Sequence, residues 1–192
     1  ASDVYKRQLL NEGIINCDSL TINLGAGVSG AGRDAKQNII HAEVSEGVKP
    51  YNIGKHRHIA ELEQEFKKAT INKIEITFIP HLLPQNRGVL VSIPIASPAS
   101  IVHKTLENFY KNAPFIIILP IEEIPATQNV RGSNFWHIGV ISDHNKDRSV
   151  VISVLDNLIK GSAGQAIQNA NIMFGFDETS GFLESPIFPW NE

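Results

Sequence analysis

The chain has 192 residues, of which 42% are hydrophobic and 19% charged, so it can bury a core of ordinary size and is not expected to be disordered. Lys and Arg total 17 against 20 Asp and Glu, a formal net charge of −3, and no basic block is present, which argues against nucleic acid or an anionic membrane as partner. No apolar run approaches the ~20 residues of a membrane span and none opens the chain like a signal peptide, so we expect a cytoplasmic protein.

The cysteine and methionine contents add two points. Cys17 is the single cysteine, which excludes an internal disulfide and a cysteine-rich zinc site. Met173 is the single methionine, and the first eight residues look arbitrary. We therefore expect residues 1–8 to be a non-native appendage, with the natural sequence resuming near Leu9.

The first third of the chain mixes regular elements with irregular segments. Residues 9–15 are typical of the end of a helix stopped by a glycine, and residues 19–24 alternate like a strand. A glycine-dense loop follows at 25–33, and residues 34–57 are irregular. Residues 59–69 place apolar side chains on one face and charges on the other, which predicts a short amphipathic helix.

Two β-rich runs, 73–79 and 88–95, come next. Residues 80–87 between them are too many for a two-residue hairpin, although the two runs can still be neighbours in a sheet. Ser97 and Pro98 then supply an N-cap and a first-turn proline for a helix. The buried stripe of this helix is expected to comprise Ile101, Val102, Leu106, Phe109 and Tyr110.

Three more strands are predicted at 115–119, 134–142 and 149–155, the last two joined by a polar hairpin loop at 143–147. Residues 161–174 form the last predicted helix. Its expected apolar stripe comprises Ala163, Ala166, Ile167, Ala170 and Phe174. About six strands with few helices between them favour an α+β fold, a mixed and largely antiparallel sheet covered by helices, over a doubly wound sheet.

The spacing Gly25-x-Gly27-x-x-Gly30 matches the dinucleotide fingerprint and follows a predicted strand. No helix is predicted at the third glycine, so no helix N-terminus is available for a pyrophosphate. A tight turn is one alternative. The other is an anion or substrate loop, in which backbone N–H groups approach a ligand and Arg33 brings a positive charge.

His56, Arg57 and His58 place three donors directly before a predicted helix. Two neutral imidazoles can bind zinc, but the other histidines lack the spacing of further ligands, so no metal site is expected. Solvated loop histidines are one alternative, and a catalytic or substrate-binding pair is the other. His103 lies in a predicted amphipathic helix and is expected on the surface.

Two arginines, Arg87 and Arg131, each lie next to a glycine at the mouth of a predicted strand. A guanidinium suits a carboxylate or phosphate through paired hydrogen bonds, although a solvated arginine at a loop end is the commoner outcome. Residues 156–161 end a strand and lead into the last helix, whose small residues allow close packing against another helix or a flat ligand.

Six motifs occur in order along the chain. They are Gly27-Val28-Ser29-Gly30-Ala31-Gly32-Arg33, His56-Arg57-His58, Glu61-x-Glu63-Gln64, Pro80-His81-Leu82-x-Pro84-x-Asn86-Arg87-Gly88, Val130-Arg131-Gly132-Ser133-Asn134-Phe135 and Asp156-Asn157-Leu158-x-Lys160-Gly161. Together they strongly resemble the N-acetyl-gamma-glutamyl-phosphate reductases, the NADP-dependent enzymes of arginine biosynthesis. The resemblance extends from Leu9 to about Gly181, and it implies the fold of the C-terminal domain of glyceraldehyde-3-phosphate-dehydrogenase-like reductases.

The resemblance also implies a reaction. In that family a Rossmann domain binds NADPH and a cysteine attacks the acyl phosphate; both would precede Leu9, and neither is within this sequence. Hydride then reduces the thioester to the semialdehyde. His58 resembles the histidine that acts as base for the cysteine, a role that suits an imidazole with a pKa near ~6.5. Cys17 falls in a turn and is not the nucleophile. The implied substrate-binding residues are Ser29, Arg33, His56, Arg57, Arg87 and Arg131, and the implied cofactor-binding residues are Asn157, Lys160 and Gly161.

The expected organisation follows from the same resemblance. Residues 9–157 would form the substrate-binding and dimerisation domain, and residues 158–192 a helix and tail that pack on the NADP-binding domain. The expected partners are a small acyl phosphate and further copies of the chain, in a dimer or tetramer. The related aminoadipyl-phosphate reductase of lysine biosynthesis, a non-catalytic oligomerisation or regulatory module, and a His-x-His metal hydrolase remain as alternatives.

Overall fold

The structure, a computed structural model, describes residues 20–32, 37–69, 75–182 and 186–187. The proposed appendage at 1–8, the helix end predicted at 9–15, Cys17 and Arg33 therefore lie outside the described residues.

A single mixed sheet organises the fold, with strand order β2-β3-β1-β4-β7-β6-β5. Its strands are β1 (Leu20–Gly27), β2 (Lys49–Pro50), β3 (Ile76–Leu83), β4 (Val89–Ile95), β5 (Ile116–Ile118), β6 (Trp136–Ser142) and β7 (Ser149–Leu155). β1 pairs with β3, and β5 with β6, in parallel, while the remaining pairs are antiparallel. The predicted α+β fold is confirmed, with the short β2 as a seventh strand.

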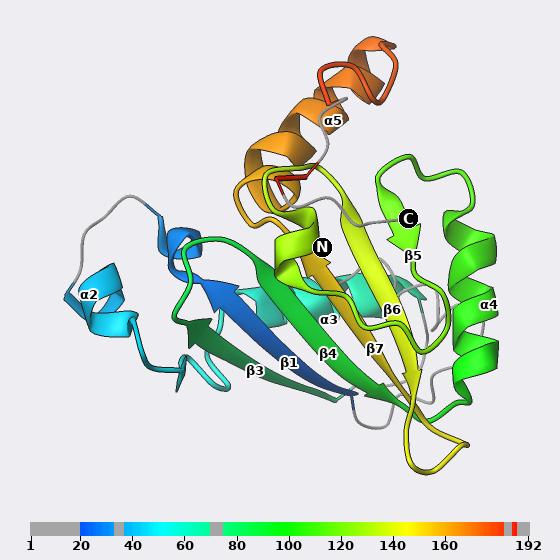
Figure 1. Ribbon diagram of the computed structural model, residues 1–192, viewed down its shortest axis with the longest axis horizontal. Helices are drawn as coiled ribbons and strands as arrows, with labels where there is room; N and C mark the ends of the chain where they lie inside the picture. Colours follow the sequence, from blue (N-terminus) through cyan, green and yellow to red (C-terminus); the bar gives the residue numbers. More distant parts are fainter. Residues whose placement is uncertain (1–19, 33–36, 70–74, 183–185, 188–192) are drawn as a thin grey trace.

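Helices and helical turns connect these strands. They are the 3₁₀ turns η1 (Val28–Ala31), η2 (Gln37–Ile39) and η3 (Thr127–Val130), the helices α2 (His41–Val44), α3 (His58–Ala69), α4 (Ala99–Tyr110) and α5 (Gly164–Phe174), and the π-helical turn η4 (Ile159–Ala163). The hydrophobic core lies between one face of the sheet and the helices α3 and α4 (Figure 1). Among the described residues, no helix is long and apolar enough to cross a membrane.

Residues at alternate positions of the strands supply the sheet's half of this core. Ile22, Ile93 and Ile138 are fully buried, and Phe66 of α3 packs in the same cluster. Burying a side chain of this size stabilises the fold by about 1.5–3 kcal/mol. The helix predicted at 59–69 and the strand predicted at 149–155 are confirmed, and both contribute side chains to the core.

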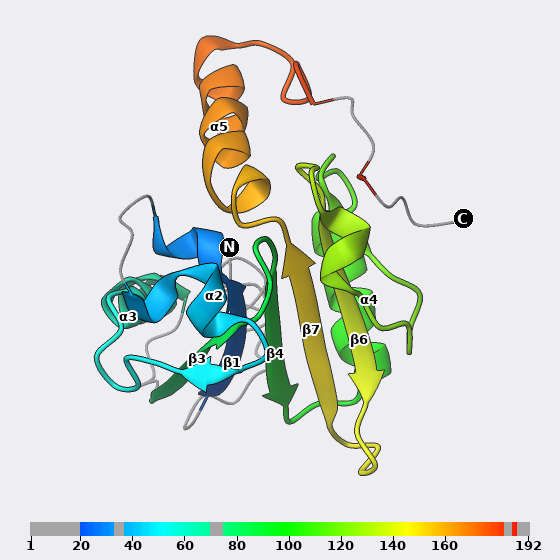
Figure 2. The same ribbon diagram turned by 60° about the vertical axis from the view of Figure 1, so that its left-hand side comes forward.

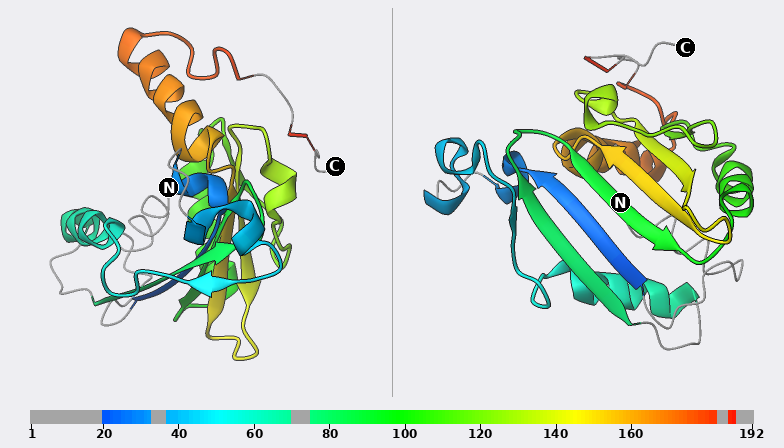
Figure 3. Two further views of the ribbon diagram at one scale, coloured as in Figure 1. Left: turned by 90° about the vertical axis from the view of Figure 1, so that its left-hand side faces the viewer. Right: turned by 60° about the horizontal axis from the view of Figure 1, so that its bottom comes forward.

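The opposite face of the sheet is only partly covered. The chain after β5 crosses it so closely that a Cβ at Gly139 would lie 2.5 Å from the carbonyl oxygen of Glu123. Beyond this crossing, the half-buried apolar side chains on this face include Leu90, Ile141, Val150 and Ile152. Figure 3 shows the sheet from two further directions.

The order of the strands in the sheet differs from their order in the chain. β3 and β4 are not neighbours, because β1 lies between them and pairs with both. β3 also continues through Pro80 to Leu83, beyond the β-rich run that was predicted to end at residue 79. A proline is tolerated because β3 lies next to the edge of the sheet, where its outer partner β2 pairs with only two of its residues.

The helix α4 buries a narrower stripe than the periodicity predicted. Val102, Leu106 and Tyr110 are buried, whereas Ile101 and Phe109 are about half exposed. Ser97 is not the N-cap, because Pro98 directly precedes the helix and makes no side-chain cap. The expectation for His103 was also wrong: its Nε2 lies 2.8 Å from the carbonyl oxygen of Leu119, which ties α4 to the end of β5.

The last helix, α5, projects beyond the end of β7 (Figure 2; Figure 3, left). Its buried residues are Gly164, Gln168 and Asn171. The stripe predicted from the apolar spacing is wrong for Ile167 and Phe174, which are 51% and 74% exposed. The apolar spacing therefore predicts the helix correctly, but not which of its faces packs against the rest of the chain.

Candidate functional site

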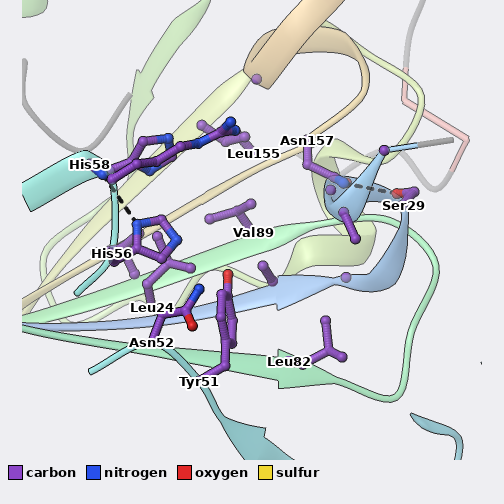
Figure 4. A pocket seen from close by; sticks show the side chains of 18 of the residues that line it. Leu24, Ser29, Tyr51, Asn52, His56, His58, Leu82, Val89, Leu155 and Asn157 are labelled. Atoms are coloured by element: carbon purple, nitrogen blue, oxygen red, sulfur yellow. Dashed lines mark hydrogen bonds between the residues drawn. The ribbon is translucent and has the colours of Figure 1, made fainter. Parts of the chain in front are cut away.

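A large open pocket of about 1220 Å³ lies on the sheet face that carries the core. Its floor consists of core residues, among them Leu24, Phe78, Val91, Trp136 and Leu155. Three segments form its polar rim: the loop after β1, the segment from β2 to the start of α3, and the turn after β7. In Figure 4, His56 and His58 lie at one side of this pocket, and Ser29 and Asn157 at the other.

The His56-Arg57-His58 motif lines the pocket where α3 begins. The backbone N–H of His58 donates to Nδ1 of His56 at 3.3 Å, which satisfies one of the free N–H groups of a helix start. Because Nδ1 accepts, His56 is neutral with its proton on Nε2. Burial lowers the pKa of His56, and the neighbouring His58 and Arg57 lower it further against the opposing effect of Glu61.

Aromatic contacts fix the ring of His56. Its centroid lies 5.0 Å from that of Phe78, 5.6 Å from that of Tyr51 and 4.7 Å from that of His58. Burial also raises the pKa of Tyr51. His56 therefore works as a packed anchor for the start of α3, whereas the ring of His58 makes no hydrogen bond within the described ranges.

The glycine-rich loop uses its backbone differently from the expected substrate loop. The N–H groups of Gly27, Val28 and Ser29 donate to carbonyl oxygens of residues 85–88, at 2.9 to 3.1 Å. A Cβ at Gly27 would lie 2.6 Å from the carbonyl oxygen of Asn86, so only glycine allows this approach. These three N–H groups are thus not available to a ligand, and the loop presents the Ser29 side chain to the pocket instead.

Asp156, at the end of β7, organises a second group of loops. Its carboxylate is fully buried, accepts from the N–H groups of Gly132 and Leu158 at 2.8 Å, and lies 3.3 Å from Nε of Arg87. Arg87 and Arg131 line a separate pocket of about 190 Å³, which shares no residue with the large one. The structure therefore does not bring these two arginines to the histidines.

The three residues implied as cofactor ligands have different surroundings. Lys160 is buried, donates to Oε1 of Gln168 at 2.6 Å, and lies 5.3 Å from the ring centre of Phe115. Burial lowers the pKa of Lys160 to about 8. The side chain of Asn157 hydrogen-bonds to Gly88 and Ser29, and Asn157 and Gly161 both line the large pocket. The Asn157 amide and the Lys160 ammonium are thus held by protein contacts, and the cofactor-binding role of Asn157, Lys160 and Gly161 stays a prediction.

Some of the pocket's polar residues escaped sequence reasoning. Lys49, Tyr51, Asn52 and Lys55 line the rim, although they follow no regular pattern along the chain. The motif that contains Asp156 does not predict that its carboxylate contacts three loops. Within the described ranges no group of three or more His, Cys, Asp or Glu side chains could hold a metal ion.

Comparison with known proteins places the chain. It matches the family described as "Semialdehyde dehydrogenase, dimerisation domain" over residues 3–157. It is 48% identical to the N-acetyl-gamma-glutamyl-phosphate reductase of Roseobacter denitrificans and 46% identical to that of Ruegeria pomeroyi, in each case over 184 residues that cover 95% of this chain and 54% of the relative. The chain thus spans about half the length of these relatives, and the matches confirm the resemblance drawn from the six motifs.

Solved structures share the fold. Aspartate semialdehyde dehydrogenase II from Vibrio cholerae superposes with a TM-score of 0.67 at 18% identity, covering 91% of this chain and 60% of that one. A probable aspartate-semialdehyde dehydrogenase from Pseudomonas aeruginosa gives a TM-score of 0.64 at 15% identity, covering 90% and 60%. The chain belongs to the family of semialdehyde dehydrogenase dimerisation domains.

Proposed function

We propose that this chain is the substrate-binding and dimerisation part of an N-acetyl-gamma-glutamyl-phosphate reductase. The whole protein would convert N-acetyl-glutamyl 5-phosphate, NADPH and a proton to N-acetyl-glutamate 5-semialdehyde, NADP⁺ and phosphate. The observation that carries this proposal is the pocket itself. It gathers Ser29, His56, Arg57 and His58 from two distant motifs around an apolar floor, in a chain 48% identical to a reductase of that name.

The charges of the pocket rim suit such a substrate. Lys49, Lys55 and Arg57 all line it, and the described part of the rim contains no Asp or Glu. A substrate with one carboxylate and one acyl phosphate is anionic at both ends, so cationic donors complement it. The apolar floor, which includes Leu24 and Leu155, would hold its methylene groups.

His58 is the base in this proposal. The cysteine that attacks the acyl phosphate would come from the part of the reductases that this chain does not match. The proton of its thiol passes to the neutral imidazole of His58. The carbon–sulfur bond forms as phosphate leaves and takes a proton from solvent. NADPH, when bound, would supply the hydride that reduces the thioester carbonyl, and the imidazolium returns the thiol proton to the departing thiolate. His58 lies at the first position of α3 in the pocket wall, where a ligand can reach its ring.

The surface of α5 supports the proposed domain arrangement. Ile167 and Phe174 lie seven positions apart on one face of the helix and are both more than half exposed, which leaves an apolar patch there. We assign this patch, and residues 158–192 more generally, to contact with the NADP-binding part of the whole protein. The proposed cytoplasmic location follows from the biosynthetic role.

The test uses a chimera. This chain is fused to that part of the Roseobacter denitrificans reductase which it does not match. The chimera should oxidise NADPH with N-acetyl-glutamyl phosphate, measured by absorbance, and at least 10-fold more efficiently than with the aminoadipyl analogue, because a pocket discriminates one methylene by ~10- to 200-fold. A chimera that folds and binds substrate but transfers no hydride would favour the non-catalytic module. Preference for the aminoadipyl compound would favour the reductase of lysine biosynthesis.

A further inference from the structure

A chain of hydrogen bonds fixes the side chain of Asn157. The N–H of Gly88 donates to its Oδ1 at 2.7 Å, so the carbonyl end of this amide faces Gly88. The NH₂ end then faces the loop after β1, where Nδ2 donates to Oγ of Ser29 at 2.8 Å (Figure 4). Because an amide nitrogen only donates, the oxygen of Ser29 accepts in this pair.

The hydrogen of the Ser29 hydroxyl is also committed. Oγ of Ser29 donates to the carbonyl oxygen of Asn86, which can only accept. A hydroxyl has one hydrogen and two lone pairs, so the two neighbours leave Ser29 one lone pair. Ser29 is half-buried and lines the large pocket. Toward a ligand in that pocket it is therefore an acceptor and not a donor.

The substrate of the proposed function offers one group that matches this acceptor. Its carboxylate, its acyl phosphate and its acetyl carbonyl all accept hydrogen bonds at neutral pH, and the amide N–H is its only donor. The rim cations Lys49, Lys55 and Arg57 are donors, and they suit the anionic groups but not the N–H. A second acceptor placed against a phosphate oxygen would instead repel it.

We propose that the Ser29 oxygen accepts the amide N–H of an N-acylated amino-acid substrate, and that Asn157 is the positioning residue that holds Ser29 in this role. This inference rests on the proposed function and names the group by which the pocket selects an N-acylated substrate. It gives Asn157 a role through Ser29, beside the cofactor contact that the resemblance implies. It also removes Ser29 from the phosphate site.

The test compares two ligands that differ at one atom. N-Acetyl-L-glutamate carries the amide N–H, and its ester isostere 2-acetoxyglutarate carries an oxygen there. Calorimetric titration of the 192-residue chain should give ~10-fold tighter binding of the amide, because the ester oxygen faces the Ser29 lone pair. Ser29→Ala should bring this ratio close to one. Asn157→Leu, which keeps the size of the side chain but removes its hydrogen bonds, should lower the ratio in the same direction.

Controls separate the role of Ser29 from general damage. Ser162→Ala removes the hydroxyl of another serine of the pocket wall and should keep the amide-to-ester ratio. Inorganic phosphate should bind Ser29→Ala as it binds the parent chain. If Asn157→Leu fails to fold, the Ser29→Ala ratio still decides the question.

Three outcomes would overturn the proposal, and they are distinguishable. Equal binding of the two ligands by the parent chain, or a ratio that survives Ser29→Ala, contradicts the inference while leaving the proposed function intact. Weaker phosphate binding in Ser29→Ala with an unchanged ratio would make the hydroxyl a phosphate donor. Failure of both ligands to bind the folded chain contradicts the proposed function itself, and the inference with it.

Discussion

At the scale of single residues, the two pocket histidines differ in what their rings can do. His56 accepts the N–H of His58 on Nδ1 and packs between Phe78 and Tyr51, and burial lowers its pKa. It is therefore held neutral and immobile. His58 begins α3, and its ring, which lies 4.7 Å from that of His56, makes no hydrogen bond in the described part of the chain, so it can exchange a proton with a reacting group.

His58→Asn in the chimeric reductase should lower kcat by ~10²- to 10⁴-fold, the usual contribution of a positioned proton-transfer group. KM should change little, because asparagine keeps the approximate size and a hydrogen-bonding end. Steady-state kinetics with NADPH and the acyl phosphate measure both constants.

His56→Asn is the matched control for that measurement. Asparagine can still accept the N–H at the start of α3, but the ring that packs on Phe78 is lost. We expect KM to rise more than kcat falls. Unchanged kcat in His58→Asn, together with a large loss of kcat in His56→Asn, would exchange the roles assigned to the two histidines.

At the scale of elements, local patterns identified most strands and helices but not their neighbours. The alternation in β4 and the consecutive apolar residues of β7 are properties of short segments, and both strands lie where the sequence predicts them. The insertion of β1 between β3 and β4 depends on pairings between distant segments, which periodicity does not encode. For α5 the pattern failed differently, because Gln168 and Asn171 are buried by polar contacts with the tail at Glu178 and Ser180.

The start of α5 depends on a glycine with no room for a side chain. A Cβ at Gly164 would lie 2.4 Å from Oδ1 of Asn134 and 2.8 Å from Cγ2 of Ile159. Gly164→Ala should therefore destabilise the chain by ~1–2 kcal/mol, because overpacking outweighs the ~1 kcal/mol gain in helix propensity. Urea unfolding followed by circular dichroism measures the change.

The control for this substitution is Gly47→Ala, which places its methyl group in open space. It should change the free energy of unfolding by less than ~1 kcal/mol, and in the stabilising direction if it acts through the unfolded chain. Equal losses in the two variants would show that the contacts of Gly164 with Asn134 and Ile159 do not determine the cost.

The strand β6 carries a buried histidine that should make stability depend on acid. Burial lowers the pKa of His137 to about 4, whereas the unfolded chain takes up the proton near pH 6.5. The unfolded state therefore binds more protons between these values, and the free energy of unfolding should fall by up to about 3 kcal/mol as pH drops through this window. Above pH 6.5 His137 is neutral in both states, so it no longer changes the free energy of unfolding with pH.

His137→Gln should remove most of that acid dependence, whatever its effect on stability at neutral pH. Urea midpoints between pH 7 and pH 4 measure the slope. His81→Gln, at a half-buried histidine of β3, should retain it. A parent-like slope in His137→Gln would assign the acid loss to other groups.

At the scale of the whole molecule, the pocket is assembled from segments far apart in the sequence. Ser29 and Asn157 meet across 128 positions, and no local pattern connects them. The sequence predicted both residues as members of the site only through the resemblance of their motifs. The sequence could not predict the contact between Ser29 and Asn157 or the position of Arg87 and Arg131 in another pocket. It also could not predict that Lys160 donates a hydrogen bond to Gln168.

The uncovered face of the sheet gives the last prediction. Alternation along β7 points Val151 into the core and Val150 and Ile152 to the other face, which also carries Leu90 of β4 and Ile141 of β6. A sheet with this face in solvent would carry polar residues at these four positions, as it does at Ser92. The family match to a dimerisation domain indicates a second copy of the chain as the partner of this surface.

Ile152→Glu should therefore convert the oligomer to a monomer, because a carboxylate at the centre of an apolar interface would lose its hydration without gaining a partner. Light scattering at micromolar concentration should give at least twice the chain mass for the parent and the chain mass for the variant. Ile101→Glu makes the same change on the half-exposed outer side of α4 and should leave the oligomer intact. A parent chain that is monomeric, or an Ile101→Glu variant that dissociates while Ile152→Glu does not, would place the subunit contact elsewhere on the molecule.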